Sequence, residues 1–202
     1  MSAAIPTKGN LIAIKRSLEL ARQGYDLMDK KRNILVHEMM GLIDRASEVQ
    51  QQIDVVFREA YASLQMANIT LGFCDQIAAA VPVDDSISVR LRSVMGVEIP
   101  SITKDESQPQ IEYGLAETNS QLDDAYLKFI RVKKLSRTLA ELENTIYRLA
   151  YAVIKTQKRA NALQNIIIPG QTADIKSITE ALEEKDREDY ARLKVIKDKI
   201  HQ

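Results

Sequence analysis

The chain has few of the residues from which active sites and bulky cores are built. Its 202 residues include one cysteine, two histidines, three phenylalanines and no tryptophan. The single cysteine, Cys74, excludes an internal disulfide and argues against thiolate metal sites, and only His37 and His201 remain as imidazole ligands. The scarcity of large aromatics favours helices packed through aliphatic seams. We therefore expect no metal site and no cofactor.

Net charge and long hydrophobic runs are also absent. Lys plus Arg and Asp plus Glu both number 28, so the formal net charge is zero and no overall field recruits nucleic acid or an anionic membrane. No apolar run approaches the ~20 residues of a membrane helix, and residues 1–11 contain no signal-peptide hydrophobic region. The sequence predicts a cytoplasmic protein with no nucleic-acid partner and no direct membrane insertion.

Proline is missing from two long stretches, roughly residues 7–81 and 110–168. In the first stretch, residues at alternating spacings of three and four are apolar except for Arg32 and Ser63. They are Leu11, Ile14, Leu18, Ala21, Tyr25, Met28, Arg32, Leu35, Met39, Leu42, Ala46, Val49, Ile53, Val56, Ala60, Ser63 and Ala67. A 3.5-residue period held this long specifies a left-handed coiled coil, about 85 Å long at ~1.5 Å per residue.

The second stretch supplies a partner seam with the same kind of spacing. Its members are Ala125, Phe129, Val132, Leu135, Leu139, Leu142, Ile146, Leu149, Val153, Thr156, Ala160, Leu163 and Ile167. One residue is lost near Val132, a stammer that should overwind the supercoil locally. We expect a kink or break near residues 169–170, at Pro169-Gly170, after which a charged segment becomes helical again.

Charge indicates how the two helices pair. Residues 128–159 carry nine basic and two acidic residues, whereas residues 38–59 carry five acidic and two basic ones. An antiparallel pairing in which partner numbers sum to roughly 190 matches these sections, and it also sets acidic residues 174–189 against Lys8, Lys15 and Arg16. Such ion pairs are worth only a few tenths of a kcal/mol each, so they select the register more than they add stability.

Residues 82–102 have a different composition. Ile87, Val89 and Leu91 alternate as on a strand, Met95-Gly96 reads as a turn, and Val97 to Ile99 reads as a return strand stopped by Pro100. An isolated hairpin is marginal in water, so we expect it to pack on the helices or on a partner.

The predicted fold class is therefore all-α. Two long helices, one N-terminal and one C-terminal, form an antiparallel coiled coil with a small β-hairpin in mid-chain. Residues 1–81 form the N-terminal helix, residues 82–117 the hairpin and connecting loops, and residues 118–202 the C-terminal helix.

No pattern of catalytic residues is found in the sequence. Asp84-Asp85 is explained by a turn, and Glu183-Glu184 by a solvated helix face. The seven glycines are dispersed and form no phosphate-binding loop. The basic section 128–159 is best explained by its own acidic partner helix, with an acidic protein surface as the alternative. We expect no catalytic residue and no enzymatic activity of the chain itself.

Four segments, in order along the chain, resemble the D subunit of the vacuolar/archaeal-type rotary ATPase or ATP synthase. They are "IPTKGNLIAIKRSLELARQGYDLMDKKRNIL", "VMGVEIP", "TQKRANALQNIIIP" and "ITEALEEKDREDYARLKVIK". The resemblance implies a central rotor stalk, an antiparallel coiled coil that transmits torque between ATP chemistry in a catalytic head and proton or sodium transport in the membrane sector. It implies as partners the catalytic and non-catalytic head subunits (A and B), the F subunit of the stalk and the membrane-proximal C/d funnel subunit.

Two surfaces are candidates for these contacts. The first is the uncharged segment from Ala160 to Ala173, which we call the collar; Ala162, Ile166 and Ile168 lie off its predicted seam, and Lys158 and Arg159 precede it. The second is the hairpin, through Val89, Leu91, Val97 and Ile99. The alternatives are a prefoldin-like coiled-coil chaperone subunit, which would form hexamers with free coil tips, and a membrane-surface scaffold, which would need a broad basic face.

Overall fold

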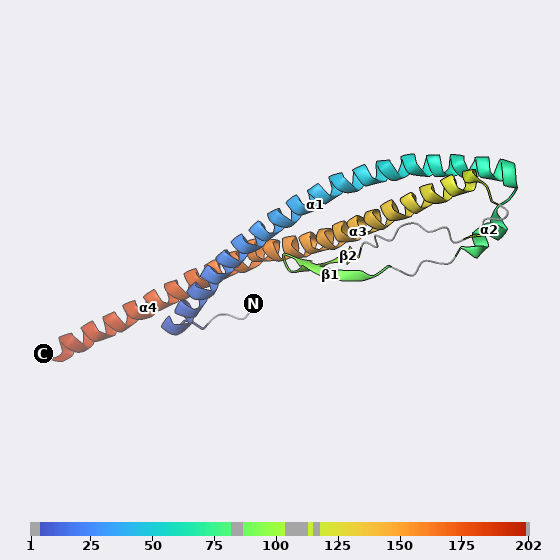
Figure 1. Ribbon diagram of the computed structural model, residues 1–202. Helices are drawn as coiled ribbons and strands as arrows, with labels where there is room; N and C mark the ends of the chain where they lie inside the picture. The colour runs from blue at the N-terminus through green and yellow to red at the C-terminus, as the bar shows by residue number, and fades with distance from the viewer. Residues whose placement is uncertain (1–4, 82–86, 104–112, 115–117, 201–202) are drawn as a thin grey trace. The chain divides into compact units, whose positions relative to one another are not determined.

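The computed structural model describes residues 5–81, 87–103, 113–114 and 118–200. Along the chain (Figure 1) the elements are α1 (Lys8–Leu71), α2 (Asp75–Ala80), β1 (Val89–Val94), β2 (Val97–Ile102), α3 (Ser120–Ala162), the π-helix η1 (Leu163–Ile167) and α4 (Ile168–Ile200). They fall into two compact units, one made of residues 1–34 with 153–202 and the other of residues 35–152. The predicted class of long helices with a two-stranded hairpin is confirmed. Asp84-Asp85 and His201 lie outside the described residues.

The predicted seam of α1 is the buried face of the helix. Every seam position from Leu11 to Ala67 is buried or half-buried, and Leu35, Ala60 and Ala67 are fully enclosed. In α3 the seam positions from Ala125 to Leu163 are likewise buried or half-buried. Burial of apolar side chains at this period explains why such a charged sequence forms long helices, because most helical stability in proteins comes from the packing of an amphipathic face rather than from propensity.

Side-chain contacts within each unit confirm the antiparallel register. The cross-helix pairs are Ser17 with Gln171, Arg32 with Gln157, Ser63 with Asp124 and Thr70 with Gln121. In each pair the residue numbers sum to within three of the predicted value of 190. The predicted charge match also brings Lys8 to within 3.7 Å of Asp186, but both side chains are largely exposed, so this ion pair adds little stability.

The two polar residues in the seam of α1 each make a specific cross-helix contact. Arg32 donates to the Gln157 amide oxygen at 2.8 Å, and the Ser63 hydroxyl donates to Asp124 at 2.9 Å. Lys128 Nζ lies 2.7 Å from the same Asp124 oxygen, and its hydrogen bond, then that of Ser63, lowers the pKa of the Asp124 carboxyl below its ordinary value. A polar group in a seam costs stability but fixes register, which accounts for these two exceptions.

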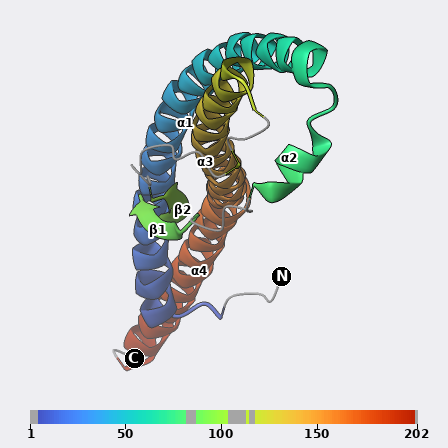
Figure 2. The same ribbon diagram turned by 45° about the vertical axis from the view of Figure 1, so that its right-hand side comes forward.

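The first helix ends ten residues earlier than the predicted boundary at residue 81. Gly72 adopts a left-handed φ of 80° and donates its N–H to the Asn68 carbonyl at 3.0 Å, which is a glycine C-terminal cap. The chain then forms the short α2, which Figure 2 shows separated from α1 by a bend. Residues from α1, α2 and α3 join Tyr113 in a small core around Ala67 and Leu122. The predicted end of this helix lies just before a proline, whereas the helix ends at a glycine.

The hairpin closes with a two-residue turn in which Met95 and Gly96 have φ values of 51° and 75°. Positive φ at both positions is the geometry of a type I′ turn, which matches the twist of the flanking strands. Contrary to prediction, Pro100 does not stop the strand, since β2 continues to Ile102 and Pro100 pairs with Leu91. Counted from the turn this is a non-hydrogen-bonded pair, so the missing N–H of Pro100 costs no ladder bond.

Helical backbone also continues through Pro169 and Gly170, so the chain does not break there. The irregularity lies just upstream in η1, where the Ile168 N–H donates to the Leu163 carbonyl five residues back. A proline ring clashes with the carbonyl four residues before it in a regular α-helix. The wider π-turn opens that position, and it places Pro169 in the first turn of α4, where a missing N–H is tolerated.

Candidate partner-contact surfaces

The four candidate residues of the hairpin lie on opposite faces of the sheet. Val89 and Leu91 share one face and are 59% and 61% exposed. Val97 and Ile99 occupy the other face, where Ile99 is only 3% exposed and Val97 is half-buried. The sequence pattern did not separate them, because alternation on each strand leaves open which set faces the core until the register is known. Val89 and Leu91 are the two that remain accessible to a partner.

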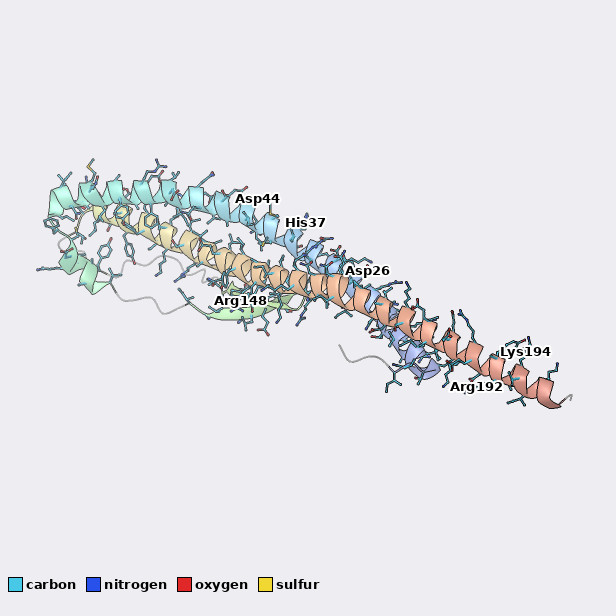
Figure 3. The ribbon with its side chains drawn as sticks, turned by 180° about the vertical axis from the view of Figure 1, so that it is seen from behind. Asp26, His37, Asp44, Arg148, Arg192 and Lys194 are labelled. Carbon is cyan, nitrogen blue, oxygen red and sulfur yellow. The ribbon has the colours of Figure 1, made fainter. Side chains whose placement is uncertain are left out.

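The buried face of the hairpin is tied to α3. The Arg148 guanidinium donates to the backbone carbonyl of Glu98 at 3.0 Å, and Figure 3 shows Arg148 beside the hairpin. Glu98 pairs with Ser93 at a non-hydrogen-bonded position, so its carbonyl points away from β1 and is free to accept. Together with buried Ile99, this bond fixes the hairpin against the helices, and the expectation that the hairpin packs on the helices is confirmed.

A cavity of about 640 Å³ lies between the hairpin and the two helices of the same unit. Its charged lining residues are Glu38, Arg45, Arg92, Lys134, Arg137 and Glu141, and its apolar floor includes Leu142 and Leu149. Cations outnumber carboxylates, yet both signs are present on facing elements. The cavity therefore has the mixed character of a groove between packed elements rather than that of a dedicated anion site.

The collar spans the end of α3, η1 and the start of α4. Lys158 and Arg159 are exposed, Ile166 is 62% exposed, and Ala162 and Ile168 are half-buried. Ile166 is thus the candidate residue that offers most apolar surface. All five lie in the unit of residues 1–34 and 153–202.

The π-turn changes which collar residues belong to the seam. Steps of four and three from Leu163 would place Ile167, Gly170 and Asp174 inward. The π-turn makes the first step five residues long, and the seam becomes Ile168, Gln171, Ile175, Ile178 and Leu182, all buried or half-buried. Ile167, predicted in the seam, is 40% exposed, while Ile168, predicted outside it, faces inward.

A signal for this shift was present in the sequence. The apolar residues Ile175, Ile178 and Leu182 fit a seam only if it passes through Ile168, which requires one extra residue after Leu163. Reading the seam backwards from α4 would have found the insertion.

Two further observations concern chemistry. Among the described residues no group of three or more His, Cys, Asp or Glu side chains is arranged to hold a metal ion. In the same part of the chain, no helix combines the length and apolar character needed to cross a bilayer.

Comparison with known proteins covers nearly the whole chain. The family model for the D subunit of ATP synthase matches residues 10–198. The D subunit of the V-type ATP synthase of Thermotoga neapolitana is 45% identical over 202 residues, which span 99% of both chains. The D subunits of the A-type ATP synthases of Methanopyrus kandleri and Pyrococcus furiosus are 34% and 35% identical; the matches cover 96% and 95% of this chain, and 86% and 92% of the relatives. The chain therefore belongs to the family of ATP synthase D subunits.

Proposed function

We propose that the chain is the central rotor stalk of a V/A-type ATP synthase or ATPase. The observation that carries this proposal is the match to the D-subunit family along nearly the entire chain. The antiparallel seam, which keeps one register in both units, supports it on physical grounds. A part that transmits torque needs two strands locked against sliding, and interlocked seam side chains with polar register contacts supply that lock.

In this role the chain performs no ATP chemistry itself. It turns within the head formed by the A and B subunits, and carries torque to proton or sodium transport in the membrane sector. The F subunit of the stalk and the C/d funnel subunit near the membrane are its other partners. The chain itself is cytoplasmic and peripheral to the membrane as part of this complex. The prefoldin-like alternative finds no support among the three relatives described above, each of which is named as a D subunit of an ATP synthase.

The collar is the surface we assign to the head. An axle that passes several equivalent subunits meets each of them in several orientations, and a buried unpaired charge would cost several kcal/mol at each mismatch. An uncharged segment between Arg159 and Asp174 avoids that cost. Lys158 and Arg159, exposed just before it, are placed for transient contacts with acidic groups.

Introducing a charged side chain in place of Ile166 tests this assignment. Ile166→Glu should weaken co-purification with the head or uncouple ATP hydrolysis from rotation, whereas the matched neutral variant Ile166→Gln should lose less because it adds no charge. Ile166 is 62% exposed, so neither variant should unfold the chain. Equal behaviour of the two variants and the unmodified chain would show that the collar does not face the head.

The exposed hairpin face is the surface we assign to the neighbouring stalk subunits. Deleting residues 86–102 should leave both helices folded while it changes ATPase rate or stalk assembly. The paired substitution Val89→Ser with Leu91→Ser, on strand residues more than half exposed, should give the same functional loss without removing Ile99 from the core. The hairpin is only structural if the deletion unfolds the helices and the paired serine substitution has no effect on ATPase rate or stalk assembly.

The direct test of the function is assembly and rotation. The chain is expressed with its own genome's head and stalk subunits, isolated by an affinity tag, and a bead is attached to it in the immobilised head. ATP-driven, one-directional rotation is expected. Failure of the head subunits to co-purify with the unmodified chain would contradict the stalk assignment.

A further inference from the structure

The open edge of β1 carries backbone groups that the hairpin itself does not use. The Thr103 N–H donates to the Ser88 carbonyl at 3.0 Å, and hydrogen-bonded pairs alternate along the ladder. Val89, Leu91 and Ser93 therefore stand at non-hydrogen-bonded pairs, and their N–H and C=O groups point away from β2. Within the part of the chain that the structure describes, no other group bonds to them.

The outer edge of β2, in contrast, is closed to another strand. Pro100 has no N–H to donate, and the outward carbonyl of Glu98 already accepts from Arg148 at 3.0 Å. Prolines and covering elements are the usual means by which proteins prevent strand addition at a sheet edge. β1 has neither, since it contains no proline and all its residues except Val94 are exposed. The hairpin is thus protected on one edge and open on the other.

Charge indicates which kind of strand fits the open edge. Arg90 and Arg92 are both exposed and lie on the same face of β1, because they are two residues apart. In an antiparallel pairing of two copies of β1 centred on residue 90, 91 or 92, arginine stands opposite arginine, and like charges directly opposite each other are destabilising. A second copy of this chain is therefore disfavoured as the occupant.

The same face calls for negative charge on the added strand. Arg92 also lines the cavity beneath the hairpin, where cations outnumber carboxylates. A strand with carboxylates two residues apart places them opposite Arg90 and Arg92, and the residue between them then lies beside Leu91 on the other face. Leu91 is 61% exposed, so an apolar side chain suits that position. The edge therefore fits the pattern acidic, apolar, acidic.

We propose that β1 binds an extended acidic strand of a neighbouring stalk polypeptide, which converts the hairpin into a three-stranded sheet. The inference rests on the proposed function and deepens it, because it gives the mode by which the hairpin binds its partner. In such an addition the backbone bonds supply affinity and the alternate side chains supply specificity. A third strand also stiffens a two-stranded hairpin that is marginal by itself. The competing explanation is a contact made only by the exposed side chains of Val89 and Leu91.

Proline on the open edge separates the two explanations. Leu91→Pro removes one outward N–H but no bond of the ladder, because Leu91 stands opposite Pro100 at a non-hydrogen-bonded pair. Leu91→Ala is the matched control, since it loses the side chain and keeps the N–H. Ser93→Pro and Ser93→Ala form a second pair on the same edge. Each variant is purified, and its affinity for the stalk subunits encoded by its own genome is measured.

Leu91→Pro should bind about tenfold more weakly than Leu91→Ala, and Ser93→Pro about tenfold more weakly than Ser93→Ala. Binding to the unmodified chain should slow hydrogen exchange at the amides of Val89, Leu91 and Ser93. Equal affinity within both proline and alanine pairs would show that side chains alone make the contact, and the inference would be wrong. If the proline variants lose the hairpin, hydrogen exchange decides, and a complex in which these three amides gain no protection overturns the inference.

The charge of the added strand has its own test. Arg90→Gln with Arg92→Gln should weaken binding, and the affinity that remains should fall less steeply as salt is added. An unchanged affinity and salt dependence would show that the added strand is not acidic. The proposed function is tested separately by the head. Co-purification of the chain with the head, without protection of the β1 amides by any stalk subunit, contradicts this inference alone, whereas failure to assemble with head and stalk contradicts the proposed function.

Discussion

Substituting a buried seam leucine should destabilise the helix pair strongly, whereas substituting an exposed leucine of the same helix should destabilise it only weakly. Leu149 and Leu127 both lie in α3, but Leu149 is 1% exposed whereas Leu127 is 51% exposed. Leu→Ala removes about three carbon groups, each worth ~0.8 kcal/mol when buried. Leu149→Ala should therefore cost about 2.4 kcal/mol from transfer alone, while Leu127→Ala should cost roughly half as much or less.

The cavity beside Leu149 limits the additional cost. In closed cores a Leu→Ala change reaches up to ~5 kcal/mol, because the void left behind is empty. Leu149 already lines the space beneath the hairpin, so its removal enlarges an existing cavity and does not open a new one in a fully packed core. We expect the total to stay near about 2 to 3 kcal/mol, roughly 5 to 10 °C in melting temperature for a chain of this length.

Urea denaturation followed by circular dichroism in the far ultraviolet measures both variants. The reasoning is refuted if Leu149→Ala costs no more than Leu127→Ala, since the seam would then not carry the stability. A loss near ~5 kcal/mol would instead show that the space beneath the hairpin behaves as a closed core.

Three further predictions concern single contacts. Gly72→Ala should destabilise the chain by about 1 kcal/mol because Gly72 has φ of 80°, whereas Gly41→Ala, in the middle of α1 with nothing near an added Cβ, should stabilise it by a similar amount; thermal melts compare the two. Asn119→Ala should cost about 1 kcal/mol in the same assay, since the Asn119 side chain caps α3 by accepting from the Leu122 N–H at 3.0 Å. The lowered pKa of Asp124 stabilises the fold above the ordinary aspartate pKa, and this stabilisation is lost as pH falls through the folded-state value. Asp124→Asn should therefore flatten the decline in stability on acidification, measured by urea midpoints between neutral and acidic pH; an unchanged slope would contradict it.

The helices and their register could be predicted from the sequence because both depend on a long repeat. A period held from Leu11 to Ala67 averages out local exceptions, and the two polar exceptions, Arg32 and Ser63, turned out to make cross-helix hydrogen bonds. Charge distribution placed the register correctly, even though the ion pair observed between residues 174–189 and the basic residues set against them, Lys8 with Asp186, is weak and exposed. The distribution of charged residues therefore indicated the register, but the ion pairs contribute little to stability.

The features that were missed depend on single residues. The end of α1 depends on the φ angle of Gly72, and the length of β2 on whether Pro100 meets a hydrogen-bonded or a non-hydrogen-bonded position. Neither can be read from periodicity, because a glycine or proline has one meaning within an element and another at its end. The faces of Val89 and Ile99 followed only once the turn at Met95 and Gly96 fixed the register of the strands.

The collar shows how one local deviation changes the meaning of a whole segment. Under a strict heptad, Ile167 would be a core residue and Ile168 a surface residue; with one residue inserted, their roles are exchanged and every seam position after them moves by one. The same insertion lets Pro169 stay inside a helix that continues to Ile200. A proline that would otherwise end the paired segment therefore becomes compatible with a continuous one, and the surplus isoleucines are placed outward in a region from which charge is absent.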